Sequence, residues 1–191
     1  MADIEILNRE TLSDRKYKLE SVQARYTGFS GNTVEVRNEV YHRPGGGTIL
    51  LYDEERKTVL LTEQVRIPTV VNGNPSGNLI EACAGITDEG ELPEQGIVRE
   101  VEEETGYRIS EIKKIYEAYG SPGGITEIIH YFLGKYSPDM KVDKGGGVDA
   151  GEDIKLVEWT FEEAREKLNS NQIRDTKTIV LLQYALLHGI I

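Results

Sequence analysis

The sequence of 191 residues lacks disulfide partners and long apolar runs. Cys83 is its only cysteine, so no disulfide can form within the chain, and the polar start at Met1 lacks the apolar segment of a signal peptide. No apolar run approaches the roughly 20 residues that a membrane-spanning helix needs. We therefore expect a cytoplasmic protein that does not enter a membrane.

Positive charge is also scarce. Lys and Arg number 22 against 33 Asp and Glu, which gives a net charge of -11 and a pI of about 4.8. Binding to nucleic acids or anionic membranes requires clustered Lys and Arg, so neither partner is expected. The three histidines, His42, His130 and His188, have no metal-ligand spacing. If so acidic a protein handles an anionic substrate, a cation must stand between the two.

The chain has no phosphate-binding P-loop. Gly45 to Gly47 form a glycine run, but the Lys-Ser/Thr pair of a P-loop does not follow it. We interpret this run as a flexible joint between an extension, residues 1–44, and a main domain, residues 45–191. A chain of this length suits one ordinary domain with a small appendage.

The extension contains the pattern of a β-hairpin over residues 15–41, with a turn at residues 28–32. On the return strand Val34, Val36 and Val40 share one face, and Glu35, Arg37, Glu39 and Tyr41 share the other. A hairpin alone is marginally stable. We therefore expect its apolar face to pack on the main domain or on a second subunit.

Apolar runs, turn residues and helix caps divide the main domain into alternating strands and helices. The predicted strands cover residues 48–52, 58–62, 79–84, 115–119, 128–136 and 154–159. The predicted helices cover residues 93–105, 161–168 and 176–187. A long polar segment, residues 137–153, contains three consecutive glycines and is typical of a mobile acidic lid.

The helix over residues 93–105 has the most informative pattern. Pro93 suits its first turn, and Gly106 suits a left-handed cap at its end. At about 100° per residue, its acidic side chains at positions 100, 103 and 104 fall on one arc beside the apolar stripe of Ile97, Val98 and Val101. Three carboxylates therefore border the buried face of this helix.

Such clustering costs free energy. Like charges at i and i+4, as in Glu100 and Glu104, destabilise a helix by about 0.2 to 0.5 kcal/mol, and partial burial increases that cost. A bound Mg²⁺ ion would offset it, since hard cations prefer carboxylate and carbonyl oxygens. The alternative is a solvated acidic helix face.

The spacing around this helix favours the metal site. Residues 85–107 fit the pattern G-x5-E-x7-R-E-U-x-E-E-x-G-U, where U is a bulky aliphatic residue. Only the last position departs, with Tyr107 in place of the aliphatic residue. The pattern resembles the Nudix box, the signature of hydrolases that split a nucleoside diphosphate linked to another moiety.

The resemblance implies an α/β fold, the Nudix α/β/α sandwich with a mixed β-sheet, preceded by the N-terminal β-hairpin extension. It implies that Mg²⁺ is held by Glu100, Glu104 and the carbonyl oxygen of Ala84, with Glu103 assisting. Arg99 would orient Glu103 from one turn away. Gly85 would turn the backbone sharply at the substrate pocket and leave the Ala84 carbonyl free.

In similar nucleotide-sugar hydrolases the catalytic base is a glutamate in the glycine-rich loop. This implies Glu152 as the base and a further metal ligand, with Asp149 as the alternative. An N-terminal extension in these relatives builds a homodimer and contributes to the partner's pocket. Arg37 and Glu39 then become substrate contacts, whereas charge pairs between strands are the alternative.

Three further residues of the main domain are candidates for substrate binding. Arg66 follows an apolar strand and would grip a phosphate through its planar fork, or form a surface salt bridge. Glu127 lies at the start of a strand, where it would contact the sugar or the metal site, or would simply be a polar residue at a strand end. Lys177 opposes the dipole of the helix that it begins, and an anionic substrate would compensate.

The implied substrate is a nucleoside diphosphate sugar. The Ser-Pro-Gly at residues 121–123 resembles the branch that hydrolyses ADP-ribose and related nucleoside diphosphate sugars. Within it, residues 69–74, residues 145–147 with 152–154, and residues 173–175 with Lys177 most resemble GDP-mannose-hydrolysing members, and ADP-ribose is the alternative substrate. A module that senses a nucleotide without cleaving it is a different class, in which we would expect an eroded box. A plain Ca²⁺-binding protein would need an EF-hand pattern, which the sequence lacks.

Overall fold

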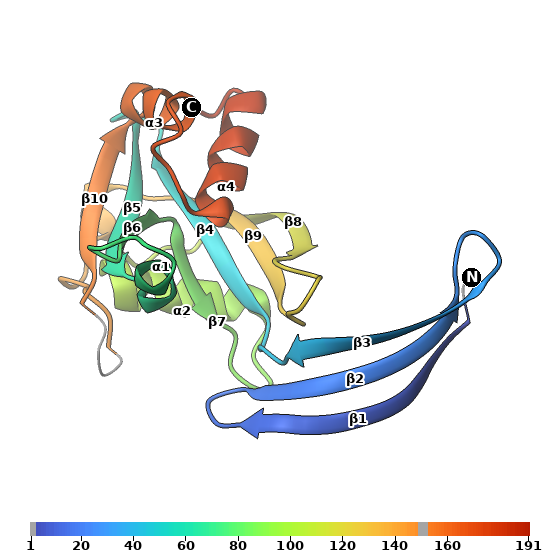
Figure 1. Cartoon of the computed structure of the whole chain (residues 1–191). Coiled ribbons are helices and arrows are strands. Elements are labelled where there is room, and N and C mark those ends of the chain that lie inside the picture. The colour runs from blue at the N-terminus through green and yellow to red at the C-terminus, as the bar shows by residue number, and fades with distance from the viewer. Residues whose placement is uncertain (1–2, 149–152) are drawn as a thin grey trace. The chain divides into compact units, whose positions relative to one another are not determined.

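The computed structural model describes residues 3–148 and 153–191. The chain forms two compact units. Unit 1 contains Met1–Gly45 and Ala118–Ile129, and unit 2 contains Gly46–Glu117 and His130–Ile191. Figure 1 shows the strands and helices of both units, and each unit is described by itself.

Unit 1 is built on a three-stranded antiparallel sheet in the order β1-β2-β3 (Figure 1). Its strands are β1 (Ile4–Asp14), β2 (Lys18–Thr27) and β3 (Thr33–Tyr41). The predicted hairpin is β2-β3. The sequence did not reveal β1, because register shifts between Ile6 and Asn8 and between Thr11 and Ser13 break the period of two.

The register gives the unit 1 sheet one apolar and one polar face. Residues directly opposite one another on neighbouring strands point to the same side of a sheet. The apolar face therefore carries two rows of three cross-strand neighbours, Ile4-Tyr26-Val34 and Ile6-Ala24-Val36. The polar face carries Arg25, which pairs with Glu5 at 3.4 Å and with Glu35 at 2.8 Å.

Glu20 is a buried charged residue of unit 1, with 3% of its surface exposed. Its carboxylate pairs with Lys18 and Arg9, and His42 Nε2 lies 2.8 Å from it. Hydrogen bonds from Lys18 and then Arg9 lower the pKa of Glu20 to about 2, against the opposing effect of burial. We call these four residues the Glu20 cluster.

The main sheet has seven strands (Figure 1). Five follow the order β10-β5-β4-β9-β8, while β6 pairs with β5 and β7 pairs with β4. Their bounds are β4 (Gly46–Asp53), β5 (Thr58–Val65), β6 (Asn78–Glu81), β7 (Cys83–Ile86), β8 (Ile112–Tyr119), β9 (Ile128–Lys135) and β10 (Lys155–Thr160).

The single strand predicted for residues 79–84 is two strands. β6 pairs with β5 up to Glu81, and β7 pairs with β4 from Cys83. Between them the Ala82 N–H donates to Thr178 Oγ1 at 2.7 Å instead of to a neighbouring strand. The chain thus changes its pairing partner at Ala82, which a continuous apolar run did not indicate.

In the described residues of unit 2 the chain forms four α-helices and a short 3-10 helix. They are α1 (Ile67–Val71), α2 (Pro93–Thr105), η1 (Pro138–Met140), α3 (Phe161–Asn169) and α4 (Thr176–Leu187). α2 and α4 have the predicted bounds. α1 was not predicted, because five residues rich in β-branched side chains show no helical period.

Helices cover both faces of the main sheet. All eight residues of β4 are buried, as expected only for a strand covered on both sides. α2 packs on β4 and β7, and α4 also packs on β4. The core between α2 and the sheet contains Ile49, Leu51, Ile97, Val101, Phe132 and Tyr136. The predicted α/β sandwich with a mixed sheet is confirmed.

None of the helices in residues 3–148 and 153–191 combines the length and apolar character that crossing a membrane requires.

Candidate functional site

α2 is fixed at both ends and along one face. Pro93 begins it, and the Leu92 N–H donates to Gln95 Oε1 at 3.1 Å. Gly106 ends it in the left-handed region, with φ of 72°. Ile97 and Val101 are buried in the core, so the direction of every other side chain on the helix is set.

The carboxylates of α2 lie at graded depths. Glu104 is buried with 4% of its surface exposed, whereas the side chains of Glu100 and Glu103 are 16% and 30% exposed. Glu102 points elsewhere and pairs with Arg108 at 2.7 Å. We call Glu100, Glu103 and Glu104, together with Arg99, the acidic face of α2. A deep carboxylate with two shallower neighbours is not a solvated charge run.

Arg99 joins α2 to the preceding loop. Its Nη1 donates to Glu100 Oε1 and to Glu103 Oε2, each at 3.0 Å. Its Nη2 donates to Glu91 Oε2 and to the Ile86 carbonyl oxygen, each at 3.2 Å. The hydrogen bond from Arg99 lowers the pKa of Glu91. Glu91 therefore braces the loop, and Arg99 holds two carboxylates of the acidic face.

Gly85 makes room for the acidic face. A methyl group at this position would overlap the Glu100 carboxyl group. Gly85 lies within β7, paired with Gly47, so the expected sharp turn at Gly85 is wrong. Close approach of a side chain, not backbone conformation, requires glycine here. The Glu100 carboxylate consequently lies against the backbone beside Ala84.

Cys83 connects the deep carboxylate to β7. Burial raises the pKa of the Cys83 thiol well above its usual value, and the charge of Glu104 and a hydrogen bond with Glu104 raise it further. The thiol therefore stays protonated and donates to the Glu104 carboxylate. The sequence had indicated Cys83 only as a cysteine without a partner.

The donor set suits a hard divalent cation in its chemistry. Carboxylates of Glu100, Glu103 and Glu104 lie on one helix face, and Glu100 lies beside the backbone that carries the Ala84 carbonyl. Across residues 3–148 and 153–191, no group of three or more His, Cys, Asp and Glu side chains is gathered closely enough to hold a metal ion. Arg99 pairs with Glu100 and Glu103 instead.

The glycine-rich segment after η1 is bound to α2. Gly146 N–H donates to the Glu104 carbonyl oxygen at 2.9 Å, and Gly147 N–H donates to that of Glu103 at 3.1 Å. This part of the predicted lid segment therefore lies against the last turn of α2. Glu152 and Asp149, the proposed base and its alternative, lie outside the described residues.

Arg66 and Lys177 converge on one buried carboxylate, Glu81. Arg66 Nε donates to Glu81 Oε2 at 2.6 Å, and Lys177 Nζ donates to Glu81 Oε1 at 3.2 Å. Lys177 also pairs with Asp175 at 2.6 Å, which caps α4 by accepting from the Thr178 N–H. We call Arg66, Glu81, Asp175 and Lys177 the Glu81 cluster.

The protein itself compensates the cation at the start of α4. Burial alone would lower the pKa of Lys177, but the charges of Glu81 and Asp175 outweigh it and raise the pKa. The sequence missed Glu81 as the centre of this cluster. A lone acidic residue in the apolar run 79–84 was the available signal.

The remaining predicted contacts lie in unit 1. Glu127 pairs with Arg43 at 3.3 Å. Arg37 and Glu39 are exposed on β3, on the same face as Glu35. Within the part of the chain that the structure describes, neither makes a charge pair across the sheet, unlike Arg25.

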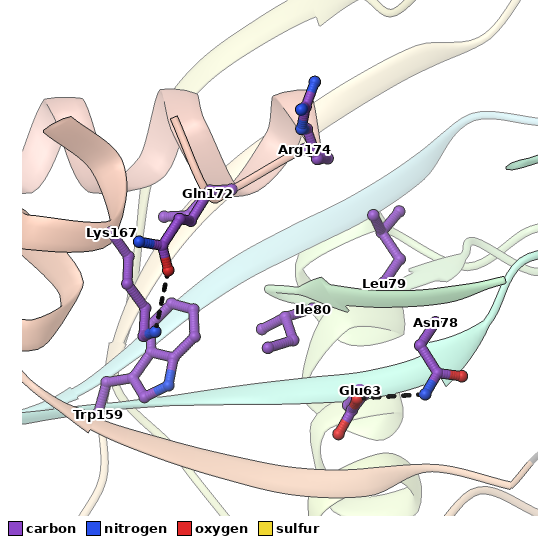
Figure 2. A pocket seen from close by; sticks show the side chains of 9 residues that line it. Glu63, Asn78, Leu79, Ile80, Trp159, Lys167, Gln172 and Arg174 are labelled. Atoms are coloured by element: carbon purple, nitrogen blue, oxygen red, sulfur yellow. Dashed lines mark hydrogen bonds between the residues drawn. The ribbon is translucent and has the colours of Figure 1, made fainter. Parts of the chain in front are cut away.

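Unit 2 also contains a cavity of about 210 Å³ (Figure 2). Lys167 Nζ lies 5.1 Å from the centre of the Trp159 ring and hydrogen-bonds to Gln172. The full lining is Glu63, Asn78, Leu79, Ile80, Trp159, Lys167, Gln172, Ile173 and Arg174. Ligand pockets usually measure about 300 to 1,000 Å³. None of the residues predicted to bind substrate lines this cavity, so it does not replace the acidic face as the candidate site.

Comparisons with known proteins place the chain in a family and identify similar enzymes. A family model described as NUDIX domain matches residues 42–178. The chain is 44% identical over 188 residues to the GDP-mannose pyrophosphatase of Cronobacter sakazakii, covering 98% of this chain and 97% of that protein. It is 45% identical over 181 residues to the GDP-mannose pyrophosphatase of Escherichia coli K12, covering 95% and 94%.

The fold has a solved counterpart. A crystal structure described as an ADP compounds hydrolase superposes with a TM-score of 0.72, covering 99% of this chain and 97% of the other at 16% identity. At that identity the likeness concerns the fold alone. Together with the acidic face of α2 and the family match over most of the chain, it leads to one assignment. The chain belongs to the Nudix family of hydrolases.

Proposed function

We propose that this chain hydrolyses the diphosphate of a nucleoside diphosphate sugar, converting GDP-mannose to GMP and mannose 1-phosphate with the help of Mg²⁺. The observation that carries the proposal is the identity of 44% to 45%, over nearly the whole chain, to two proteins named GDP-mannose pyrophosphatase. The filled acidic face of α2 supports catalysis, because a module that only senses nucleotides does not need a buried carboxylate there.

Nudix hydrolases generally use a divalent metal ion. Glu100, Glu104 and the Ala84 carbonyl oxygen would hold it here, with Glu103 assisting and Glu152 as a further ligand. When bound, the ion would neutralise the diphosphate and make a water molecule at the site more acidic. Mg²⁺ suits this set because it prefers oxygen ligands and keeps several waters.

The protein's own groups supply orientation and proton transfer. Arg99 holds Glu103 and Glu100 by hydrogen bonds of 3.0 Å, which fixes the side chains before substrate arrives. Gly85 leaves the space that the Glu100 carboxylate needs beside β7. Glu152 would accept the proton of the attacking water, with Asp149 as the alternative base.

Arg66 is the proposed phosphate contact with the best support. In the described ranges the Arg66 side chain hydrogen-bonds only through Nε, to Glu81, and it is half-exposed. The terminal nitrogens of its guanidinium would then grip a phosphate as a fork. Lys177, Glu127, Arg37 and Glu39 complete the proposed substrate contacts, the last three from unit 1.

We also propose a homodimer built through residues 1–44, with residues 45–191 as the catalytic domain. The apolar face of the unit 1 sheet supports this, since Ile4 and Ile6 are exposed there beside Tyr26, Val34 and Val36. A free, buried thiol at Cys83 and a net charge of -11 favour a cytoplasmic enzyme without nucleic-acid or membrane partners.

The test is phosphate-coupled turnover of GDP-mannose, ADP-ribose, UDP-glucose and a dinucleoside polyphosphate, each with Mg²⁺ and with a chelator. We expect metal-dependent release of GMP from GDP-mannose in preference to the other products. Preference for ADP-ribose would retain the chemistry and replace the substrate. A folded protein that turns over none of the four would overturn the proposal in favour of a nucleotide-sensing module.

A further inference from the structure

The last turn of α2 is completed by a segment from far along the chain. A helix leaves its last carbonyl groups without partners inside the helix. Here the carbonyl oxygens of residues 103 to 106 all accept from residues 141–147. The carbonyl oxygen of Glu103 accepts from Gly147 N–H at 3.1 Å, and that of Glu104 accepts from Gly146 N–H at 2.9 Å. The carbonyl oxygen of Thr105 accepts from Lys141 Nζ at 2.8 Å. The carbonyl oxygen of Gly106 accepts from Val142 N–H at 2.8 Å and from Asp143 N–H at 3.2 Å.

The two backbones touch directly. A methyl group at Gly106 would overlap the Asp143 carbonyl oxygen, and one at Gly145 would lie 2.6 Å from the Glu104 carbonyl oxygen. Both glycines have positive φ, of 72° and 70°. The backbone of residues 141–147 therefore packs directly on the backbone at the end of α2, without side chains between them. A shift of this segment would also shift the last turn of α2.

Tyr107 and Lys141 lie at the start of this contact. The two residues form an isolated antiparallel bridge, and Lys141 Nζ lies 4.6 Å from the centre of the Tyr107 ring. The Tyr107 ring meets the Tyr136 ring edge to face, with centres 5.2 Å apart. Tyr136 is fixed in turn, because its hydroxyl hydrogen-bonds to Thr58 and Glu158, each at 2.8 Å. The ring under the ammonium group is thus held from the core.

Tyr107 is also the single position at which the chain departs from the aliphatic pattern of the box. An aliphatic side chain would fill the space over Tyr136, but it has no π-electron face to attract an ammonium group. The ammonium group that donates to the Thr105 carbonyl oxygen therefore also contacts the face of the Tyr107 ring.

We propose that Tyr107 and Lys141 form a clamp that positions residues 141–147 against the end of α2, and so fixes the turn that carries Glu103 and Glu104. Both are positioning residues, and their effect on the reaction rests on the proposed function. Loosening the clamp misplaces the carboxylates more than it weakens substrate binding. The rate constant kcat therefore falls while KM changes little.

The clamp is tested with Tyr107→Leu, which gives the box its aliphatic residue, and Lys141→Met, which removes the charge but keeps the stem. Tyr107→Phe and Lys141→Arg keep the ring and the charge. Lys144→Met is the matched control, because Lys144 belongs to the same segment and has no ring contact within the described ranges. Each variant is assayed for kcat and KM with GDP-mannose and for amide hydrogen exchange over residues 141–148.

We expect kcat to fall roughly tenfold in Tyr107→Leu and in Lys141→Met, with KM within about twofold and no further loss in the double variant. Exchange at Val142, Asp143, Gly146 and Gly147 should accelerate in the same variants. The Phe, Arg and Lys144→Met variants should match the wild type. Normal exchange and kcat in Lys141→Met, or additive losses in the double variant, would overturn the clamp.

The exchange measurement separates the two proposals. If the wild type turns over no substrate, the proposed function fails, and exchange over residues 141–148 still decides whether the clamp exists. If the wild type is active and the exchange of Lys141→Met equals that of Lys144→Met, the clamp fails and the function stands.

Discussion

The acidic face of α2 and the Glu81 cluster are opposite arrangements of charge. At α2 one guanidinium, that of Arg99, contacts several carboxylates, those of Asp88, Glu91, Glu100 and Glu103. In the Glu81 cluster two cations meet two carboxylates, so positive and negative charges are equal. The balanced cluster is complete within the protein, whereas the acidic face retains an excess of negative charge. The proposed Mg²⁺ ion would balance this excess.

The largest effect should come from the deepest carboxylate of the acidic face. Glu104→Gln keeps the shape of the side chain and removes the charge, so we expect turnover of GDP-mannose to fall by at least about a hundredfold with the unfolding temperature unchanged. Glu102→Gln is the matched control on the exposed side of the same helix and should stay close to the wild type. Similar activity of both variants would remove the distinction between the two sides of α2.

The space beside β7 provides the next test. Gly85→Ala places a methyl group where the Glu100 carboxyl group lies, so we expect turnover to fall about ten- to a hundredfold and stability to fall by about 1 to 3 kcal/mol. Adding Glu100→Asp shortens the acid and should restore part of the stability, measured by urea unfolding, without restoring turnover. Stability that does not recover would show that overlap with Glu100 is not the cause.

Substitutions in the Glu81 cluster should lower the free energy of unfolding. Lys177→Met leaves Glu81 buried with Arg66 as its remaining cation, and we expect a loss of about 2 to 4 kcal/mol in urea unfolding. The double variant Glu81→Gln with Lys177→Met should lose less, because it does not bury an uncompensated charge. Equal losses in the single and double variants would contradict the idea that charge balance holds this cluster together.

The smallest effect concerns unit 1, where the Glu20 cluster can be titrated. The pKa of Glu20 is lowered from its usual value of 4.5 to about 2 in the folded protein, so the folded state favours the charged carboxylate. This contribution to stability is complete above about pH 4.5 and is lost as the pH falls toward 2. Hydrogen exchange of β1 to β3 should show that loss. Glu20→Gln should remove the dependence, and Glu10→Gln, on β1, should keep it.

Local signals made much of the fold predictable. The caps at Pro93 and Gly106 and the apolar stripe between them determine α2, so its bounds and the direction of its carboxylates followed from the sequence. The capping box of Thr160 and Glu163 likewise begins α3, with the Glu163 N–H donating to Thr160 Oγ1 at 3.1 Å. Each of these features depends on residues a few positions apart.

Contacts between distant residues were not predictable in the same way. Arg66, just after β5, and Lys177, in the first turn of α4, both hydrogen-bond to Glu81 although they are 111 positions apart in the sequence. A pattern within a short stretch of sequence cannot predict such a contact. The binding of Gly146 and Gly147 to α2 was missed for the same reason, since a glycine-rich stretch by itself indicates only freedom of the backbone. β1 escaped notice because two register shifts disrupt its alternation.

The closure of α2 by residues 141–147 also orders the folding of the protein. Thr105 and Lys141 are separated by 36 positions, and β8 and β9 lie between them. During synthesis the helix emerges well before the segment that completes it, so its last turn stays frayed until residues 141–147 have emerged and bound. Catalytic competence is therefore acquired late, and a chain that stalls before residue 141 holds every charged residue of the box without the geometry to use them.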